Sequence, residues 1–501
     1  MTSESNVLYY GDNLDVLRRH VHTDSVDLVY LDPPFNSNAN YNILFEEHGE
    51  KAAAQVQAFT DTWTWDSDAR ADYEEVVEAG GRVAEAMRAF YTMLGGSDMM
   101  AYLARMSLRL VELHRVVKPT GSLFLHCDPT ASHYLKLLLD SIFGPKHFRN
   151  EIAWCYWGPG SPGQRQFSRK HDVILWYSRA DVWTWNPAAV RIPHASKTVE
   201  NYKAGLLGSG FAAGDLGAVR ALDVGGKIPE DWWPIAIAPR GKEYLGYPTQ
   251  KPIKLLERIV LAASNPGDLV LDPFCGCGTT VDAAQELGRR WIGIDITHLA
   301  VGLIKHRLAD RYGPDIAKTY RVIGEPTTVD DARVLAREDP FQFQAWALGL
   351  VGARVAGSDK KGGDKGIDGR LYFHDGSPDT RQIVFSVKAG HLVPNFVRDL
   401  RGVIEREAAD IGVLISFEKP TAGMQAEAAE AGFYSPGPLD QTKYPRIQLR
   451  TVGQLLDGNG IAYPHLGGSN VTHRRAARAR VDAPEALELF ERAAEEPDPY
   501  G

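Results

Sequence analysis

Residues 268–295 form the segment that most constrains the fold of this 501-residue chain. The segment begins with an apolar strand that ends at Asp272, continues through a turn that contains two glycines, and leads into a helix predicted over 281–287. A second apolar strand then ends at Asp295. This order of strand, glycine turn, helix and strand predicts a parallel α/β unit of the Rossmann type.

The glycine turn has the features of a site for a nucleoside ligand. Gly276 and Gly278 allow the backbone to approach a ligand closely, and the N-terminus of the following helix offers unpaired N–H groups to a carboxylate. Asp295 lies at the spacing expected of a carboxylate that accepts hydrogen bonds from ribose hydroxyls. The alternative is a Rossmann-type unit without a nucleoside ligand.

A second motif, Asp32-Pro33-Pro34-Phe35, follows the apolar run 26–30. The exocyclic amine of a nucleobase is a poor nucleophile, because its lone pair is conjugated into the ring. Asp32 and a backbone carbonyl near Pro33 can each accept one amine N–H bond and direct the lone pair towards an electrophile. The prolines fix φ and remove backbone donors, and Phe35 offers a flat face to an unstacked base. The alternative is an ordinary turn.

The order of these motifs resembles the β-class amino-methyltransferases of DNA, which include the modification subunits of some restriction systems. The Asp-Pro-Pro-Phe block comes first, a variable region follows, and residues 247–252 lead into the glycine turn. Residues 11–13, 148–152 and 170–172 are also similar to pieces of this family. The likeness covers roughly residues 5–325.

The resemblance implies a cofactor, a reaction and a set of site residues. In this family, bound S-adenosylmethionine donates a methyl group to adenine N6 or cytosine N4 of a flipped-out nucleotide. Asp32 resembles the adenine enzymes, whereas the cytosine enzymes usually carry Ser there, so we expect adenine N6 methylation, with cytosine N4 methylation as the alternative. The expected catalytic residues are Asp32, Pro33, Pro34 and Phe35. The expected cofactor-binding residues are Asp12, Lys251, Asp272, Pro273, Phe274, Gly276, Gly278, Thr279, Thr280 and Asp295.

Composition agrees with a large enzyme. With 44% hydrophobic residues, the chain can bury real cores in roughly two to four domains. It contains no run of eighteen apolar residues and its N-terminus is polar, so we expect no membrane partner and a cytoplasmic location. The spacing of the four cysteines matches neither a disulfide framework nor a structural zinc site.

Residues 154–246 are the expected target-recognition region. The segment holds more basic than acidic residues, although the whole chain carries a net charge of −9, and it contains seven of the eleven tryptophans. Basic residues interleaved with aromatics suit phosphate contacts and base stacking on double-stranded DNA. The alternative for any single tryptophan is a core or loop anchor. Relatives often dimerise, and a homodimer stays open here.

Three further aromatic residues have less defined roles. Residues 36–66 are expected to form a polar loop. Its Trp63 and Trp65 could contact DNA or could pack against the helices predicted over 72–118. His126, on a strand predicted over 121–128, is expected to be structural, because this methyl transfer needs no histidine.

The sequence changes character beyond about residue 330. Residues 341–355 are apolar at helical spacing, and strands are predicted over 370–374 and 382–388. Asp368 before one strand and Lys388 at the end of the next resemble the PD-(D/E)xK nuclease superfamily, in particular its Mrr-like branch.

This second resemblance makes Asp368 a ligand of Mg²⁺ and Lys388 a catalytic lysine that orients or deprotonates the attacking water. Glu338 is a candidate for an additional acid. Ser386 departs from the superfamily, which carries Glu, Asp or Gln there, and a hydroxyl is a weaker Mg²⁺ ligand. Two alternatives therefore remain, an active Mg²⁺-dependent endonuclease and a cleavage-deficient module that binds DNA or a partner.

We therefore predict an α/β protein with a Rossmann-like S-adenosylmethionine methyltransferase sheet, an inserted target-recognition region and a smaller α/β restriction-endonuclease-like domain. The expected role is restriction-modification or phage defence, and the rival is a nuclease or DNA-binding defence factor with secondary methylation. The predicted boundaries are 1–153 for the catalytic part, 154–246 for target recognition, 247–328 for cofactor binding, 329–469 for the endonuclease-like domain and 470–501 for the C-terminal tail.

Overall fold

The structure is a computed structural model of the whole chain. It describes residues 5–34, 40–47, 50–60, 63–158, 165, 167–204, 225–238, 243–247, 249–356, 366–377, 379–436, 442–464, 470, 472–473 and 476–479, with the backbone alone for 40–60.

The larger sheet has nine strands and is mainly parallel. Its order is β11 (Tyr320–Ile323), β1 (Asn6–Tyr10), β10 (Arg290–Asp295), β9 (Leu269–Asp272), β2 (Val26–Leu31), β5 (Val117–Cys127), β7 (His171–Ser178), β6 (Phe148–Cys155) and β8 (Trp232–Pro234). The strands from β11 to β5 are parallel neighbours, whereas β7 runs antiparallel to both β5 and β6. All six residues of β2 are buried, as expected of a strand covered on both faces. The predicted α/β sheet is confirmed.

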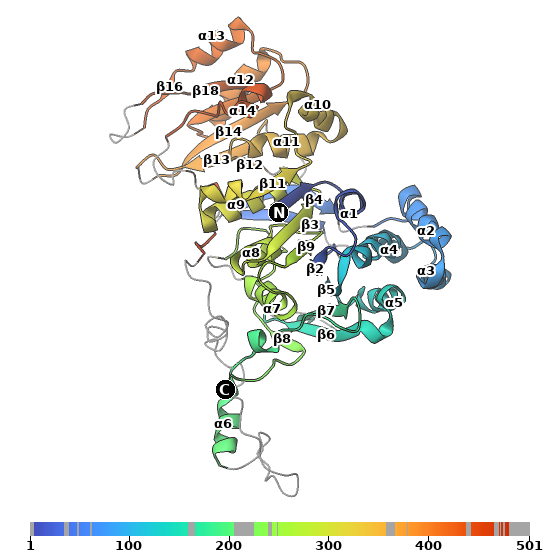
Figure 1. Cartoon of the computed structure of the whole chain (residues 1–501). Coiled ribbons are helices and arrows are strands. Elements are labelled where there is room, and N and C mark those ends of the chain that lie inside the picture. The colour runs from blue at the N-terminus through green and yellow to red at the C-terminus, as the bar shows by residue number, and fades with distance from the viewer. Residues whose placement is uncertain are drawn as a thin grey trace, which may run out of the picture.

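Helices cover both faces of this sheet (Figure 1). One layer comprises α1 (Asn13–His20), α2 (Ser67–Ala79), α3 (Gly81–Leu94), α4 (Asp98–Val116) and α5 (Ser132–Phe143). The other layer comprises α7 (Ile253–Ala263), α8 (Thr279–Glu286) and α9 (His298–Tyr312), and α6 (Ser196–Lys203) lies in the extension beyond β8. Each layer packs against its own face of the sheet as a separate apolar cluster. The arrangement is a three-layer α/β/α sandwich.

The predicted Rossmann-type segment folds as expected, with one shifted boundary. Helix α8 begins at Thr279, two residues before the predicted start at 281. Gly278 adopts a left-handed conformation with φ of +77°, which lets the chain turn directly into the helix. A Cβ at Gly278 would lie 2.6 Å from the Ile304 side chain, so packing also requires glycine there.

Two expectations for residues 36–66 now have an outcome. The backbone forms an antiparallel pair, β3 (Asn40–Glu47) and β4 (Glu50–Thr60), so the prediction of a loop was wrong. The apolar run Ile43-Leu44-Phe45, close behind Tyr41, is the strand signal that the prediction overlooked. Trp63 packs beside Tyr102 and Trp65 beside Tyr73, which supports the packing alternative for both tryptophans.

The smaller sheet belongs to a second α/β unit. Its five strands lie in the order β12 (Arg354–Val355), β13 (Gly369–Phe373), β14 (Arg381–Lys388), β15 (Ile411–Ser416) and β18 (Ile447–Thr451). Its helices are α10 (Val329–Glu338), α11 (Pro340–Gly349), α12 (Asn395–Arg406), α13 (Ala422–Glu430) and α14 (Val452–Leu456), and β16 (Phe433–Tyr434) pairs with β17 (Tyr444–Pro445). The apolar stretch predicted as helical over 341–355 is thus divided between α11 and β12.

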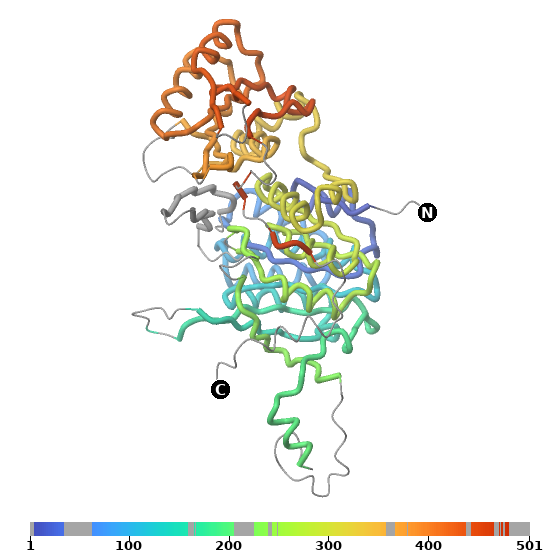
Figure 2. Tube along the Cα trace, turned by 90° about the vertical axis from the view of Figure 1, so that its left-hand side faces the viewer, coloured from blue at the N-terminus to red at the C-terminus, as the bar shows by residue number. Residues whose placement is uncertain are grey.

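The two units touch through α9 of the first and α11 of the second. The His298 N–H donates to the Gln342 side chain at 2.9 Å. A returning segment adds a second contact, since His473 stacks on His306 with ring centres 4.2 Å apart. Figure 2 shows the second unit, mostly orange, next to the part of the first unit that contains α9. Within the described residues, no helix has the length and apolar character needed to cross a membrane.

Candidate active site

The carboxyl ends of the parallel strands gather most of the predicted site residues. Asp32 follows β2, Asp272 ends β9, Asp295 ends β10 and Asp12 follows β1. These strands are neighbours in one sheet, and carboxyl ends of parallel strands lie along the same edge. Lys251, which precedes α7, reaches this edge from the face that α7 covers.

Asp32 is held by a lysine that the sequence assigned to the cofactor. The Lys251 ammonium donates a short hydrogen bond to Oδ2 of Asp32, and both side chains are largely buried. Pro33 is buried and Pro34 half-buried beside it, while Phe35 lies outside the described residues. Lys251 therefore contacts the predicted catalytic carboxylate and holds one of its two oxygens in place.

A buried histidine faces the other oxygen of Asp32. His126 has no exposed surface, and its Nδ1 lies 3.8 Å from Oδ1 of Asp32 and 3.0 Å from the Tyr30 hydroxyl. Its Nε2 lies 3.2 Å from Oδ2 of Asp172, whose Oδ1 accepts a hydrogen bond from Tyr156. The expectation of a merely structural histidine did not include this proximity to Asp32.

The charge state of Asp172 follows from this contact. Burial pushes the pKa of Asp172 upward, but the hydrogen bond and charge of His126 and the charge of Lys251 outweigh it and leave the pKa below its usual value. Asp172 is therefore ionised at neutral pH. The sequence had marked Asp172 only as part of a family-like piece, and its pairing with His126 depends on the antiparallel register of β5 and β7.

Asp272 holds the start of the glycine turn through a hydrogen bond to its backbone. It is buried and accepts a hydrogen bond from the Phe274 N–H at 3.0 Å. Burial, reinforced by the charges of Asp32 and Asp295, raises the pKa of Asp272 to about 7, although Thr280 also donates a hydrogen bond to it. The carbonyl of the next residue, Pro273, accepts a hydrogen bond from Asn13 of α1 at 2.8 Å.

Asp295 ties the turn to the end of β10. Its Oδ2 accepts the Gly276 N–H at 2.9 Å, and its Oδ1 accepts both the backbone N–H and the hydroxyl of Thr297 at 2.9 and 2.8 Å. Burial raises the pKa of Asp295 to about 6 in spite of these bonds. The Ile296 N–H also bonds this carboxylate, so ribose hydroxyls would share its acceptor positions with these donors.

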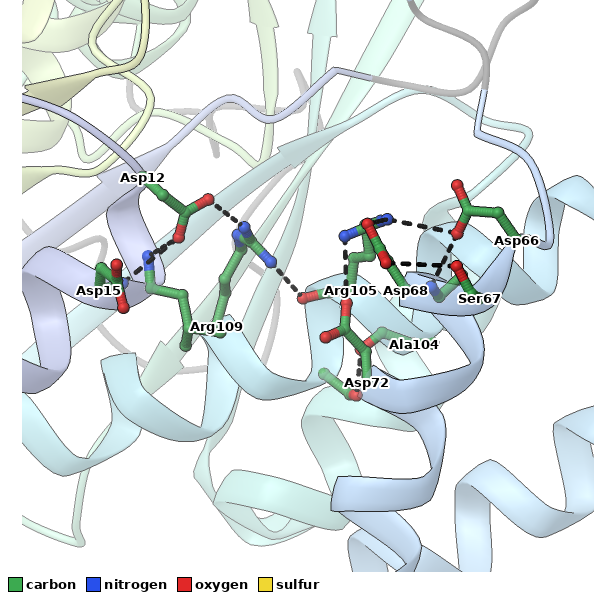
Figure 3. A network of polar contacts seen from close by, with 12 residues as sticks. Asp12, Asp15, Asp66, Ser67, Asp68, Asp72, Ala104, Arg105 and Arg109 are labelled. Carbon is green, nitrogen blue, oxygen red and sulfur yellow. Dashed lines mark hydrogen bonds and ion pairs between the residues drawn. The ribbon is translucent and has the colours of Figure 1, made fainter. Parts of the chain in front are cut away.

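Of the remaining predicted cofactor residues, some form the turn itself and others make hydrogen bonds that hold neighbouring elements. Gly276 has φ of +48°, a conformation that favours glycine, and a Cβ there would contact the Tyr247 ring at 3.4 Å. The Thr279 hydroxyl instead accepts a hydrogen bond from Arg307 at 3.0 Å and faces the interior. Asp12 caps α1 through the Leu14 N–H and pairs with Arg109 at 2.7 Å (Figure 3).

These residues fit S-adenosylmethionine. A carboxylate at the end of the second strand suits ribose hydroxyls, and the N-terminus of α8 suits the methionine carboxylate. Two carboxylates, the buried Asp272 and the half-buried Asp295, lie beside the turn, and a positive sulfonium would favour their ionised forms. The chemistry of the donor set is that of a cationic nucleoside.

The tryptophans of the target-recognition region have different environments. Trp154 is buried and donates to the Ile235 carbonyl at 2.7 Å, and Trp176 stacks on Phe124. Trp157 and Trp232 are 48% and 56% exposed. The core-anchor alternative therefore holds for the buried tryptophans, and the exposed ones are available to DNA.

The second predicted site in the smaller unit also assembles, but around an ion pair. Lys388 Nζ lies 3.6 Å from Oδ2 of Asp368, and the same oxygen accepts the Val387 N–H at 2.6 Å. Ser386, two residues before Lys388 on β14, is buried. Glu338, at the end of α10, is exposed. Among the described residues there is no group of three or more His, Cys, Asp or Glu side chains that could hold a metal ion.

Comparison with known proteins identifies the family. The family model described as DNA methylase, N6/N4 type, matches residues 26–306, more than half of the chain. The chain belongs to this family of DNA methyltransferases, which use S-adenosylmethionine. A second model, NACHT-associated inactive restriction endonuclease 1, matches residues 341–457 and confirms the predicted fusion to a restriction-endonuclease-like domain.

Two named DNA methyltransferases are similar to this chain in sequence. The chain is 27% identical to the DNA adenine methyltransferase YhdJ of Escherichia coli over 321 residues, which cover 62% of this chain and 86% of the relative. It is 45% identical to the type II methyltransferase M2.DpnII of Streptococcus pneumoniae over 237 residues, which cover 46% of this chain and 76% of the relative. Among solved structures, the cytosine-N4-specific PvuII DNA methyltransferase matches at 16% identity and a TM-score of 0.35, over 60% of this chain and 86% of that one.

Proposed function

We propose that this methyltransferase modifies N6 of adenine in a flipped-out nucleotide of double-stranded DNA. The observation that carries the proposal is the position of Asp32, which follows β2 beside the β9 turn and is close enough for its charge to raise the pKa of Asp272. A target amine held by Asp32 is then adjacent to the cofactor turn. The name of the adenine-modifying relative and the Asp at the first tetrapeptide position favour adenine over cytosine.

The residues of the chain act on the amine. Oδ1 of Asp32 accepts one amine N–H and the carbonyl near Pro33 accepts the other, so that the nitrogen lone pair leaves conjugation with the ring. S-adenosylmethionine supplies an electrophilic methyl group when it is bound. Its carbon–sulfur bond would break as the amine nitrogen bonds the methyl carbon, with the electron pair left on sulfur, and the nitrogen would then give up one proton. Lys251 keeps Asp32 in position through Oδ2.

The proposed cofactor set is the one expected from the sequence, with unequal roles. Asp295 would hold the ribose hydroxyls, and the turn from Asp272 to Thr280 would surround the methionine end. Asp12 and Lys251 would act at the edge of this site, since each already pairs with another side chain.

Nucleoside analysis tests the adenine proposal. Plasmid DNA from cells that express the wild-type chain should contain N6-methyladenine, and DNA from cells that express Asp32→Ala should not. N4-methylcytosine in its place would show that the cytosine alternative is correct. If neither methylated nucleoside is found, the result would favour a defence factor in which methylation is secondary.

We also propose that the restriction-endonuclease-like domain binds DNA or a partner without cutting DNA. The Asp368–Lys388 ion pair and Ser386 support this, because the usual second carboxylate ligand is replaced by a hydroxyl. Incubation with unmethylated and premethylated DNA, with Mg²⁺ or Mn²⁺, should leave both substrates intact. Cutting that is lost in Lys388→Ala would support the nuclease alternative and a role as a complete restriction-modification protein.

A further inference from the structure

Among the described residues, His126 is the one histidine whose ring lies within 4 Å of the predicted catalytic carboxylate of Asp32. It is completely buried on β5, and Trp154 packs edge-on against its ring at 5.4 Å. Its two nitrogens face two different carboxylates, Asp32 at 3.8 Å and Asp172 at 3.2 Å. A buried polar ring in this position requires a defined set of hydrogen bonds.

These bonds fix the tautomer of His126. An ionised carboxylate accepts but does not donate, so the Asp172 contact places the proton of the neutral ring on Nε2. Nδ1 then carries a lone pair and accepts the Tyr30 hydroxyl at 3.0 Å. The acceptor nitrogen of the ring thus also lies 3.8 Å from Asp32, while a carboxylate on the other nitrogen orients the ring, as in a histidine that acts as a base.

The ring of His126 lies among charged side chains. Asp172 and Asp32 flank the ring with two carboxylates, whereas Lys251 contacts Asp32 on the oxygen that faces away from His126. Tyr30 and Tyr156 are the other titratable groups in this cluster, and burial keeps the Tyr30 pKa well above its usual value, so that this hydroxyl stays neutral.

We propose that His126 takes up the proton that the methylated amine passes to Asp32, and so returns Asp32 to its carboxylate form. The amine nitrogen, once bonded to the methyl carbon, gives one N–H proton to Oδ1 of Asp32. That proton moves to Nδ1 of His126, the Tyr30 hydroxyl turns from donor to acceptor, and Asp172 stabilises the resulting imidazolium. The proposal rests on the proposed role of Asp32. In it His126 acts on the proton through Asp32 and does not contact the target nucleobase.

The test compares three variants of the full-length protein, namely His126→Gln, Asp172→Asn and Tyr30→Phe. For each we would measure kcat from pH 5.5 to 8.5, KM for DNA, the equilibrium Kd of S-adenosylmethionine and the thermal unfolding temperature. Tyr30→Phe is the third variant, because it removes the hydroxyl that accepts a hydrogen bond from the protonated ring but leaves the imidazole in place.

The expected result is a change in kcat and its pH profile with little change in binding. His126→Gln should lower kcat about 10-fold or more with KM and Kd within about 3-fold, and should abolish the fall of kcat at low pH that titration of the histidine causes. Asp172→Asn should move that fall to lower pH, because the imidazolium loses its anion. Tyr30→Phe should move the fall in the same direction by a smaller amount, because a neutral hydroxyl stabilises the imidazolium less than a carboxylate does.

Three outcomes have distinct meanings. A His126→Gln enzyme with kcat near the wild-type value, or with an unchanged low-pH fall, would refute the proton role. If His126→Gln fails to bind S-adenosylmethionine, the Asp172→Asn profile decides, and an unshifted profile refutes the proposal. Methylation that persists in Asp32→Ala would instead show that the proposed function of Asp32 is wrong.

Discussion

Cofactor affinity should depend on pH, because two carboxylates beside the glycine turn have raised pKa values. The pKa of Asp272 is about 7 and that of Asp295 about 6. A bound sulfonium cation stabilises both carboxylates in their ionised form, so that binding in acidic solution must first release protons. Affinity should therefore be full at pH 8 and should decrease as the pH falls through 7 and 6.

The magnitude follows from the two pKa values. At pH 6 a group with a pKa of about 7 is protonated roughly ten times as often as it is ionised, which weakens binding about 11-fold if the bound form stays ionised. The second group, with a pKa of about 6, adds a factor of about 2. From pH 8 to pH 6 the Kd should thus rise about 20-fold, equivalent to about 1.8 kcal/mol.

Isothermal titration calorimetry can measure this effect against a neutral ligand. S-adenosylhomocysteine lacks the sulfonium charge and should show a much smaller rise in Kd over the same interval. Asp272→Asn should bind S-adenosylmethionine more weakly at pH 8 but with a flatter pH dependence. An S-adenosylmethionine Kd that is the same at pH 6 and pH 8 would refute the reasoning, as would an equal rise for both ligands.

Three other predictions concern single residues. Asp32→Ala should abolish transfer of tritiated methyl groups to DNA while the S-adenosylmethionine Kd stays within a few-fold, and more than about a tenth of wild-type turnover would contradict the assigned role. Asp295→Ala should weaken S-adenosylmethionine by roughly 1–3 kcal/mol in calorimetry, because it removes an acceptor of ribose hydroxyls and the anchor of Gly276, and unchanged affinity would move the adenosine site elsewhere. Burial raises the pKa of Glu257 to about 8, so the folded state loses stability as pH rises from about 4.5 to 8. Glu257→Gln should avoid this loss and stabilise the protein by up to about 3 kcal/mol at pH 7, and an unfolding temperature that does not exceed wild type would contradict this.

The sequence predicted the Rossmann-type segment well because its signals are local. The apolar strands β9 and β10 each end in an aspartate, and the glycines between them have the conformations that such a turn needs. The start of α8 was misplaced because Thr279 and Thr280 are polar in sequence. In the structure both are buried, and their hydroxyls bond Arg307 and Asp272. Their helical position depends on partners that are distant in the chain.

The environment of Asp32 was less predictable for the same reason. Tyr30 and His126 are 96 residues apart, and His126 and Asp172 are 46 apart. Their contact requires that β2 and β5 pair in parallel and that β7 returns antiparallel beside β5. Propensity and spacing do not determine that register. Lys251 is still more distant, at 219 residues from Asp32, so the family resemblance could mark it as part of the site without revealing its contact.

In the smaller unit, Asp368 and Lys388, which the sequence resemblance singled out, lie 3.6 Å apart, and the burial of Asp368 gives a physical reason for this contact. Asp368 is largely buried, and a buried carboxylate needs a compensating charge or hydrogen bonds. Lys388 and the Val387 N–H supply both on a single oxygen. A carboxylate already satisfied in this way gains less from Mg²⁺, and the neighbouring Ser386 adds no negative charge to attract the ion. If the domain does not cut DNA, as we propose, a single Ser386→Glu change should therefore not be enough to make it cut, because the contacts of Asp368 remain.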